Sequence, residues 1–583
     1  MYVYDEIDQR LVEERVTQFA DQTRRFLAGH LTDDEFRTLR LQNGLYIQRH
    51  APMLRVAIPY GMLNARQLRM LAQVARRWDR GYGHFSTRQN MQFNWPRLED
   101  VPTILAELAT VQMHAIQTSG NCIRNTTTDH FAGIAPDEVV NPLVWCELIR
   151  QWSMLHPEFA FLPRKFKIAV SGARTDRAAV GIHDIGLQAV EQDGQTGFRV
   201  WVGGGMGRTP IVGKLIQPFV AWPHLLTYLQ ATLRVYNLHG RRDNKYKARI
   251  KILVRDLTPE VFAAQVDQEW QRIKDGPDTI LDEHVQRIAQ RFTWPAYDPA
   301  AARVDDGCEA RAAEKPAFSR WLRKNVHGHR VPGYAAVTLS LKKTGVPPGD
   351  ITADQMDAVA DLADWHGFGE LRVSHEQNLI LADVRRDQLY PLWRELEVLG
   401  LATPNVGLLT NIISCPGGDF CSLANAVSIP IVDAIQQRFE DLDHLFDIGE
   451  LDLNISGCIN ACGHHHVGHI GVLGVDKGGE EWYQVTIGGR QNARAVALDG
   501  DAAGRGGGAA IGRIIGPSFA RDQVPAVVER LVQTYLTHRD SDAERFVDVV
   551  DRLGIEQFKT DVYADPALSS TASKARAGTG ADR

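Results

Sequence analysis

The chain has 583 residues, 44% of them hydrophobic, and a formal net charge of −6. This length favours about four domains or lobes. The small negative charge excludes a general affinity for nucleic acid or for an anionic membrane surface. No apolar run approaches the roughly 20 residues of a membrane span, and the polar segment 1–25 lacks the apolar core of a secretory signal. We therefore expect a cytoplasmic protein.

The first predicted element is a helical arm over residues 1–45. An extended apolar stretch, Leu54–Tyr60, then precedes Asn64-Ala-Arg-Gln67, which has the capping-box pattern of a helix start. A strand is predicted over Phe85–Phe93, with Arg88 in its middle and on its polar face.

The same plan recurs later in the chain. Ala335–Leu341 is predicted as an extended strand, Thr352-Ala-Asp-Gln355 as a capping box and Leu371–Leu381 as a second strand. Four residues of the first segment match residues of the second at one offset of 288: Gln67, Gly81, Gln89 and Asn90 match Gln355, Gly369, Gln377 and Asn378.

Three further matches lie beyond these segments and share an offset of 285. They pair Val170-Ser-Gly172 with Ile455-Ser-Gly457, Ile185-Gly186 with Ile470-Gly471, and Phe198–Gly204 with Tyr483–Gly489. The alternative is a generic alternation of strands and glycines, but several matches in one register favour an internal duplication. We predict two α/β halves that share a site between them.

The C-terminal region is predicted to contain helices at 524–539 and 541–558, after a Gly/Ala-rich loop at 500–508. Residues 564–583 have few large apolar side chains, so we predict a disordered tail.

Four of the seven cysteines are grouped in two pairs with x5 and x3 spacing. A long chain with so few cysteines has no disulfide framework. Four thiolates among turn-forming residues suit an iron–sulfur cluster or a zinc ion, and zinc usually takes C-x2–4-C knuckles. The spacing therefore favours iron–sulfur, with zinc and inert thiols as alternatives, on Cys415, Cys421, Cys458 and Cys462.

The histidine-rich tract Gly463–His469 directly follows the last of these cysteines. Such tracts can bind metal, but we favour a polar loop that packs against the site.

Basic residues gather in the first half. Pro163–Val170 is predicted as a strand that places Lys165 and Lys167 on one face, where two ammonium groups repel unless they are solvated or share an anion. Arg124 lies in the polar loop Ser119–Asn125. Solvated surface charge is the alternative for each of them alone.

The duplication separates these charges from the cysteines. Arg88 corresponds to Glu376, while Lys165 and Lys167 correspond to Glu450 and Asp452. The grouped cysteines occur only in the second half. We infer that one half is specialised for an anion and the other for a cluster.

Two further features could contact a cofactor. Gly203, Gly204 and Gly205 follow a strand and would allow close backbone approach, and Arg249 belongs to a run of six basic residues over 241–251. The run could equally face a donor protein or solvent. Neither feature is a P-loop or a dinucleotide fingerprint, so electrons must come from a separate protein.

With these motifs the sequence resembles the siroheme-dependent sulfite/nitrite reductase family over residues 40–560. The resemblance is carried by the C-x5-C…C-x3-C pattern, Ser86-Thr-Arg-Gln-Asn90, Arg124-Asn125, Leu162-Pro-Arg-Lys-Phe-Lys167 and Gly203-Gly-Gly205. It implies an α+β fold of paired ferredoxin-like repeats and two related α/β lobes. After the arm, the expected bounds are 46–115 and 325–400 for the repeats, and 116–300 and 401–563 for the lobes.

The resemblance also assigns roles. It implies a [4Fe–4S] cluster on the four grouped cysteines, with Cys462 also ligating the siroheme iron. The anion would be bound by Arg88, Arg124, Lys165 and Lys167. Siroheme would be contacted by Gly203, Gly204, Gly205 and Arg249.

The activity implied is assimilatory reduction of sulfite to sulfide, with reduction of nitrite to ammonium as the alternative. Family sulfite reductases tend to have Lys-x-Lys where nitrite reductases have Lys-x-Asn, so Lys165-Phe-Lys167 favours sulfite. The expected electron donor is a ferredoxin or an NADPH-dependent flavoprotein subunit.

Overall fold

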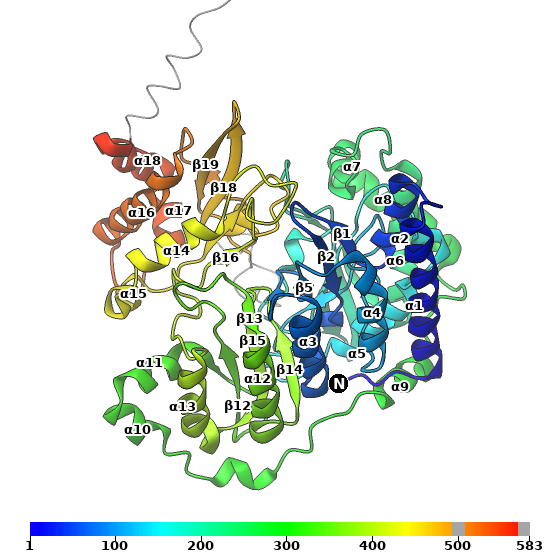
Figure 1. Cartoon of the computed structure of the whole chain (residues 1–583), viewed down its shortest axis with the longest axis horizontal. Helices are drawn as coiled ribbons and strands as arrows, with labels where there is room; N and C mark the ends of the chain where they lie inside the picture. The colour runs from blue at the N-terminus through cyan, green and yellow to red at the C-terminus, as the bar shows by residue number, and fades with distance from the viewer. Residues whose placement is uncertain (492–507, 569–583) are drawn as a thin grey trace, which may run out of the picture.

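The structure is a computed structural model that describes residues 1–491 and 508–568. The described residues form four sheets, each of five strands, and the sheets fall into two matching pairs. Figure 1 shows the first half of the chain, which runs from blue through cyan to green at α7 and α8, beside the second half, which runs from green to red. This pairing confirms the predicted duplication.

The two ferredoxin-like repeats exchange one strand with each other. The first sheet has the order β1-β2-β5-β4-β13, with β1 Leu45–Ile47, β2 Pro52–Val56, β4 Tyr82–Phe85, β5 Met91–Phe93 and β13 Asp350–Thr352. The second has the order β11-β12-β15-β14-β3, with β11 Val326–His327, β12 Tyr334–Leu339, β14 Glu370–Val373, β15 Leu379–Arg385 and β3 Met62–Asn64. Because each sheet contains a strand from the other half, the repeats cannot separate without breaking both sheets.

Both predicted capping boxes are present. Asn64 caps α3 (Ala65–Trp78) and Thr352 caps α12 (Ala353–His366), each in a reciprocal bond with the glutamine three residues on. The two helices lie side by side (Figure 1), joined by ion pairs such as Arg69 with Asp361 at 2.6 Å. Outer helices α4 (Val101–Ala109) and α13 (Leu389–Leu399) complete the repeats.

The two α/β lobes have identical sheet topology. The first contains β6 Thr127–Thr128, β7 Ile168–Ser171, β8 Ile185–Gln192, β9 Gln195–Val202 and β10 Lys214–Ala221. The second contains β16 Ile413–Ser414, β17 Leu453–Ser456, β18 Ile470–Lys477, β19 Glu480–Ile487 and β20 Arg513–Ile514. In each sheet the first three strands run parallel to one another, and each of the last two runs antiparallel to the strand before it.

Helices cover these sheets. The first lobe carries α5 Leu143–Ser153, α6 Leu225–His239, α7 Ile250–Leu257 and α8 Pro259–Ile273. The second carries α14 Ile429–Arg438, α15 Leu442–Ile448, α16 Val524–His538, α17 Phe546–Leu553 and α18 Ile555–Tyr563. The connection between the halves contains α9 Asp282–Gln290, α10 Cys308–Glu314 and α11 Pro316–Asn325. No helix in the described residues is long and apolar enough to cross a membrane.

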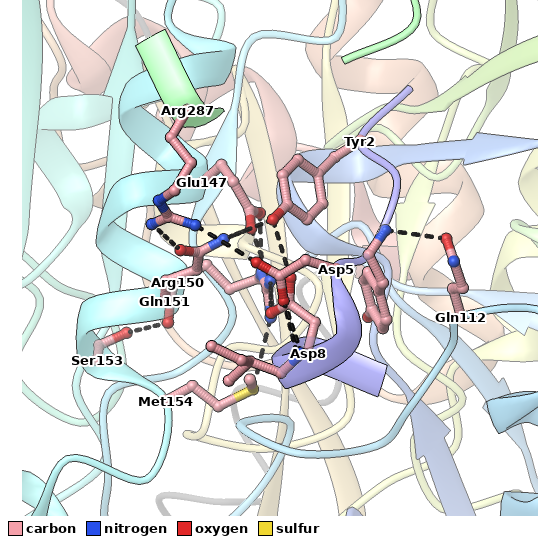
Figure 2. A network of polar contacts seen from close by, with 12 residues as sticks. Tyr2, Asp5, Asp8, Gln112, Glu147, Arg150, Gln151, Ser153, Met154 and Arg287 are labelled. Atoms are coloured by element: carbon pink, nitrogen blue, oxygen red, sulfur yellow. Dashed lines mark hydrogen bonds and ion pairs between the residues drawn. The ribbon is translucent and has the colours of Figure 1, made fainter. Parts of the chain in front are cut away.

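The N-terminal arm consists of α1 (Glu6–Leu27) and α2 (Asp33–Gln42), as predicted, and is fixed to the first lobe. Arg150 of α5 is buried and lies 2.9 Å from Asp8 of α1 and 2.6 Å from Glu147. Figure 2 shows these groups together. Removing one member of such a buried ion pair costs about 3–5 kcal/mol, so the arm belongs to the folded body.

Three strand predictions need correction. Phe85–Phe93 and Leu371–Leu381 are each two strands joined by a tight turn, so Arg88 lies at a turn and not in mid-strand. The strand predicted over Pro163–Val170 begins only at Ile168. Alternating side chains also occur in extended backbone without a full ladder, which is why the pattern misplaced these ends.

The C-terminal region follows the predicted helices, with a break at Gly554, where φ is +75°. Ordered structure continues into the predicted tail, because Leu568 is buried in the core of the second lobe. The rest of that tail, 569–583, and nearly all of the predicted loop 500–508 lie outside the described residues.

Candidate active site

A cavity between the two halves collects most of the predicted site residues. It encloses about 310 Å³, which is typical of a ligand site. Its walls include Arg88, Arg124, Lys165, Lys167, Cys415, Cys421, Cys458 and Cys462.

Arg88 reaches the cavity from the turn between β4 and β5. The Ser86 hydroxyl accepts hydrogen bonds from the backbone N–H groups of Arg88 and Asn90, at 3.4 and 3.3 Å, a turn that serine side chains favour. Gln89 takes a left-handed φ of +57°, and its side chain donates to the carbonyl of Val373 in the second repeat. The turn is therefore held by both halves.

The Arg88 guanidinium is buried and held by neutral acceptors. It donates to the Thr127 hydroxyl (2.9 Å), to the Asn125 carbonyl (2.7 Å) and to His183 Nε2 (2.5 Å). Burial, reinforced by Arg124, lowers the pKa of Arg88 to about 9. It remains a cation at neutral pH without a charge-neutralising partner.

The other three cations converge on the same space. Arg124 is held by the carbonyls of Thr118 and Gly120, at 2.8 and 2.7 Å. Lys165 and Lys167 flank the buried Phe166, whose carbonyl accepts from the Arg124 N–H. Burial lowers the pKa of both lysines.

Within the described part of the chain, no carboxylate lies at ion-pair distance from any of the four cations. The wall of the cavity is therefore a preformed site for an anion.

The cysteines face this wall from the second lobe. β16 and β17 are adjacent parallel strands that end at Ser414 and Ser456, so the residues after them emerge at one edge of the sheet. Cys415 follows Ser414 directly, and Cys458 follows Ser456 after one residue, Gly457. This topology brings together two pairs that are far apart in the sequence.

Backbone and side-chain donors point at the sulfurs. The Gly457 N–H donates to Cys415 Sγ at 3.3 Å, and the Asn460 amide donates to Cys458 Sγ at 3.4 Å. Cys462 is exposed to the cavity, and its carbonyl accepts from the Thr87 hydroxyl of the first repeat at 2.8 Å. The anion side and the thiol side are thus directly bonded to each other.

The four thiols fit an iron–sulfur cluster better than a single zinc ion. Burial and the Cys462 thiolate raise the pKa of Cys415 to about 12, so thiolates here need bound cations to form. Four sulfurs on one zinc stand about 3.8 Å apart, given Zn–S bonds of about 2.3 Å. No three His, Cys, Asp or Glu side chains of the described residues converge in this way on a single ion. The cavity and its unpaired cations also suit a carboxylate-rich tetrapyrrole.

The glycine-rich loop and Arg249 are not part of the cavity wall as the described residues form it. Arg249 is bonded to Asp184 at 2.7 Å, which uses its charge. A Cβ on Gly204 would lie 2.5 Å from the His183 carbonyl oxygen, so close packing already explains this glycine. Contact of Gly203, Gly204, Gly205 and Arg249 with siroheme stays a prediction.

Several wall residues were given no site role from the sequence: Thr87, Arg164, Gln377 and His464. Arg164 could have been found as the third basic residue of Arg164-Lys-Phe-Lys167. Thr87 lay within the motif Ser86–Asn90, Gln377 was noted only as a match in the duplication, and His464 was noted only as part of the histidine tract. In the histidine tract, His466 bonds the Gly207 carbonyl at 2.9 Å, in keeping with the polar-loop interpretation.

Comparison with known proteins agrees with this geometry. Residues 119–274 and 407–567 match the nitrite and sulphite reductase 4Fe-4S domain. Residues 46–111 and 337–399 match the nitrite/sulfite reductase ferredoxin-like half domain. Each of the two domains matches two segments of the chain, one in each half, in agreement with the duplication.

Similar curated proteins carry both substrates in their names. The sulfite reductase (ferredoxin) of Mycobacterium tuberculosis is 28% identical over 517 residues, covering 86% of this chain and 82% of that protein. The assimilatory ferredoxin-dependent nitrite reductase of Haloferax mediterranei is 30% identical over 524 residues, covering 84% and 80%.

Among solved structures, the Mycobacterium tuberculosis NirA protein superimposes with a TM-score of 0.72 at 26% identity, covering 91% of this chain and 92% of that one. The family matches span more than half of the sequence. The chain therefore belongs to the siroheme-dependent nitrite and sulphite reductase family, and its cofactors are a siroheme and a [4Fe–4S] cluster.

Proposed function

We propose that this protein is an assimilatory sulfite reductase. The observation that carries the proposal is the cation set of the cavity, in which Lys165 and Lys167 stand with Arg88 and Arg124 and no carboxylate of the described residues neutralises them. Sulfite has three oxygens and up to two negative charges, so four cations match it well. A lysine at position 167 also fits the Lys-x-Lys pattern of family sulfite reductases.

The reaction defines what these side chains must do. Hydrogensulfite takes up six electrons and six protons to give hydrogensulfide and three waters. Cys415, Cys421, Cys458 and Cys462 would hold the cluster, which would supply electrons, and the siroheme would supply the redox chemistry at the anion. The arginines hold the oxygens and offset the negative charge that grows with each electron.

The lysines add protons. Burial, together with Arg124 and against the opposing thiolate of Cys462, lowers the pKa of Lys165 to about 8. An ammonium group near this value is charged at neutral pH and still acidic enough to give up a proton. Lys165 and Lys167 therefore suit the delivery of protons to departing oxygens.

The proposed electron donor is a ferredoxin, and the proposed location is the cytoplasm. The sequence contains no nicotinamide or flavin motif, and the relatives from Mycobacterium tuberculosis and Haloferax mediterranei are named as ferredoxin-dependent. Neither of these two names supports an NADPH-dependent flavoprotein subunit, which the sequence alone left open.

Reduction of nitrite to ammonium is the second candidate, since relatives with that name are as similar as the sulfite reductases. Turnover of each anion with a reduced viologen dye separates the two. We expect kcat/KM for sulfite to exceed that for nitrite. A preference for nitrite of tenfold or more would contradict the proposal.

A further inference from the structure

His183 lies behind Arg88, away from the substrate side of the cavity wall. It is 3% exposed and follows a short turn before β8. Its Nδ1 lies 2.8 Å from the Ala179 carbonyl oxygen. Because a carbonyl can only accept, Nδ1 carries the proton of the neutral ring, and Nε2 presents a lone pair.

That lone pair faces the guanidinium. Nε2 lies 2.5 Å from Arg88 Nη1, which also donates to the Thr127 hydroxyl, while Nη2 donates to the Asn125 carbonyl. These bonds fix the plane of the guanidinium. The N–H of Nε and the second N–H of Nη2 have no acceptor among the described residues, so they are free for a ligand.

The ring must stay uncharged for this contact to exist. Burial, with Arg88 and Lys167 nearby, holds the pKa of His183 well below its usual range. A carboxylate in the same place would also orient Arg88, but it would neutralise the charge that an anion needs. A neutral imidazole orients the cation and leaves its charge available.

The second repeat supports this arrangement. His375 packs edge-on against His183, with ring centroids 6.3 Å apart. Its Nδ1 lies 3.2 Å from the carbonyl of Thr87, the residue before Arg88. His375 stands at the position that matches Thr87 in the duplication. The turn that carries Arg88 is thus braced by one histidine from each half.

We propose that His183 is a positioning residue for the substrate anion, which it serves by accepting a hydrogen bond from Arg88 and so aiming an un-neutralised guanidinium into the cavity. This inference rests on the proposed function, in which Arg88 binds sulfite. It assigns to His183 no contact with substrate.

The test uses the holoenzyme and two ligands, sulfite and carbon monoxide. Sulfite affinity is measured by optical titration of the tetrapyrrole bands, and carbon monoxide affinity is measured on the reduced enzyme as a neutral reference. His183→Phe removes the acceptor, whereas His183→Gln restores one at a similar reach. His114→Phe is the control, because His114 is equally buried and neutral but does not contact Arg88.

We expect His183→Phe to weaken sulfite binding about tenfold, as for a lost hydrogen bond to a charged group. Carbon monoxide binding should change less than about twofold, and His183→Gln should recover most of the sulfite affinity. His114→Phe should bind both ligands like the wild type. If His183→Phe fails to load its cofactors, His183→Asn, whose amide is too short to reach Arg88, replaces it in the same titration.

The Arg88→Met variant separates the proposed role of Arg88 in sulfite binding from the proposed role of His183. If it leaves sulfite affinity unchanged, the proposed role of Arg88 fails. If it weakens sulfite binding while His183→Phe does not, the proposed function stands and the inference about His183 is overturned. In the Arg88→Met background, His183→Phe should have no further effect, and a full additional loss would also overturn the inference.

Discussion

The turns Ser86–Asn90 and Ser374–Asn378 occupy matching places in the two repeats and have the same pattern of hydrogen bonds. Like Ser86, Ser374 accepts from the backbone N–H groups two and four residues on, at 3.2 and 3.1 Å. Gln377 has a φ of +62° and donates to the Phe85 carbonyl across the interface, as Gln89 donates to Val373. The backbone of the duplication is the same in both halves.

Their charges are opposite. Glu376 stands where the first repeat has Arg88, and it accepts from the Asn411 amide at 3.0 Å. Burial and the nearby Asp452, which matches Lys167, raise the pKa of Glu376. One turn thus places a cation in the cavity wall, whereas its copy carries a buried carboxyl group. The comparison teaches that the duplication supplied the geometry and that a few side chains set the charge.

The largest effect is expected at the residue that joins the two sides. Cys462→Ser should lower sulfite turnover more than about a thousandfold, because we propose that this thiolate is shared by the cluster and the siroheme. Cys146→Ser is the control, since Cys146 is buried in the core of the first lobe. Viologen-linked turnover and iron content measure the effect. Full activity of Cys462→Ser would exclude the bridging role.

Making the first turn resemble the second tests the comparison directly. Arg88→Glu should reduce kcat/KM for sulfite about a hundredfold, because a buried carboxylate would repel the anion. The matched change Glu376→Gln should alter kcat/KM less than about twofold. Equal losses from both variants would show that the halves are not specialised as described.

The substrate preference should respond to Lys167. Lys167→Asn removes one charge-assisted contact, so we expect kcat/KM for sulfite to fall about tenfold relative to nitrite. The ratio of the two rates in one preparation measures this shift and cancels differences in cofactor loading. An unchanged ratio would count against Lys167 as a determinant of preference.

The smallest effect concerns pH. Since burial lowers the pKa of Lys165 to about 8, the ammonium is charged at pH 7 and loses its proton as the pH rises through 8. KM for sulfite should therefore rise about threefold between pH 7 and 9. Lys165→Arg, which stays charged, should flatten this rise. If KM rises equally in both enzymes, a group other than Lys165 causes the pH dependence.

Local signals in the sequence located much of the fold. Capping boxes at Asn64 and Thr352 placed α3 and α12, and the offsets of the duplication placed matching strands. The spacing of the cysteines favoured an iron–sulfur cluster. Each pair lies just after the end of a strand. These features depend on neighbours in the chain.

Features set by tertiary contacts could not be predicted. The exchange of β3 and β13 between the repeats leaves no mark in either segment. The turn at Arg88 was hidden by strand-like alternation, and the serine hydrogen bonds that make it are visible only in the fold. The role of His183 depends on a partner 95 positions away.

A crystal structure of the sulfite-bound holoenzyme tests the central claim most directly. The account predicts that the sulfite oxygens contact Arg88, Arg124, Lys165 and Lys167, all from the first half, with the four cysteines of the second half on the cluster. An anion held mainly by second-half side chains, or by none of these four cations, would contradict it.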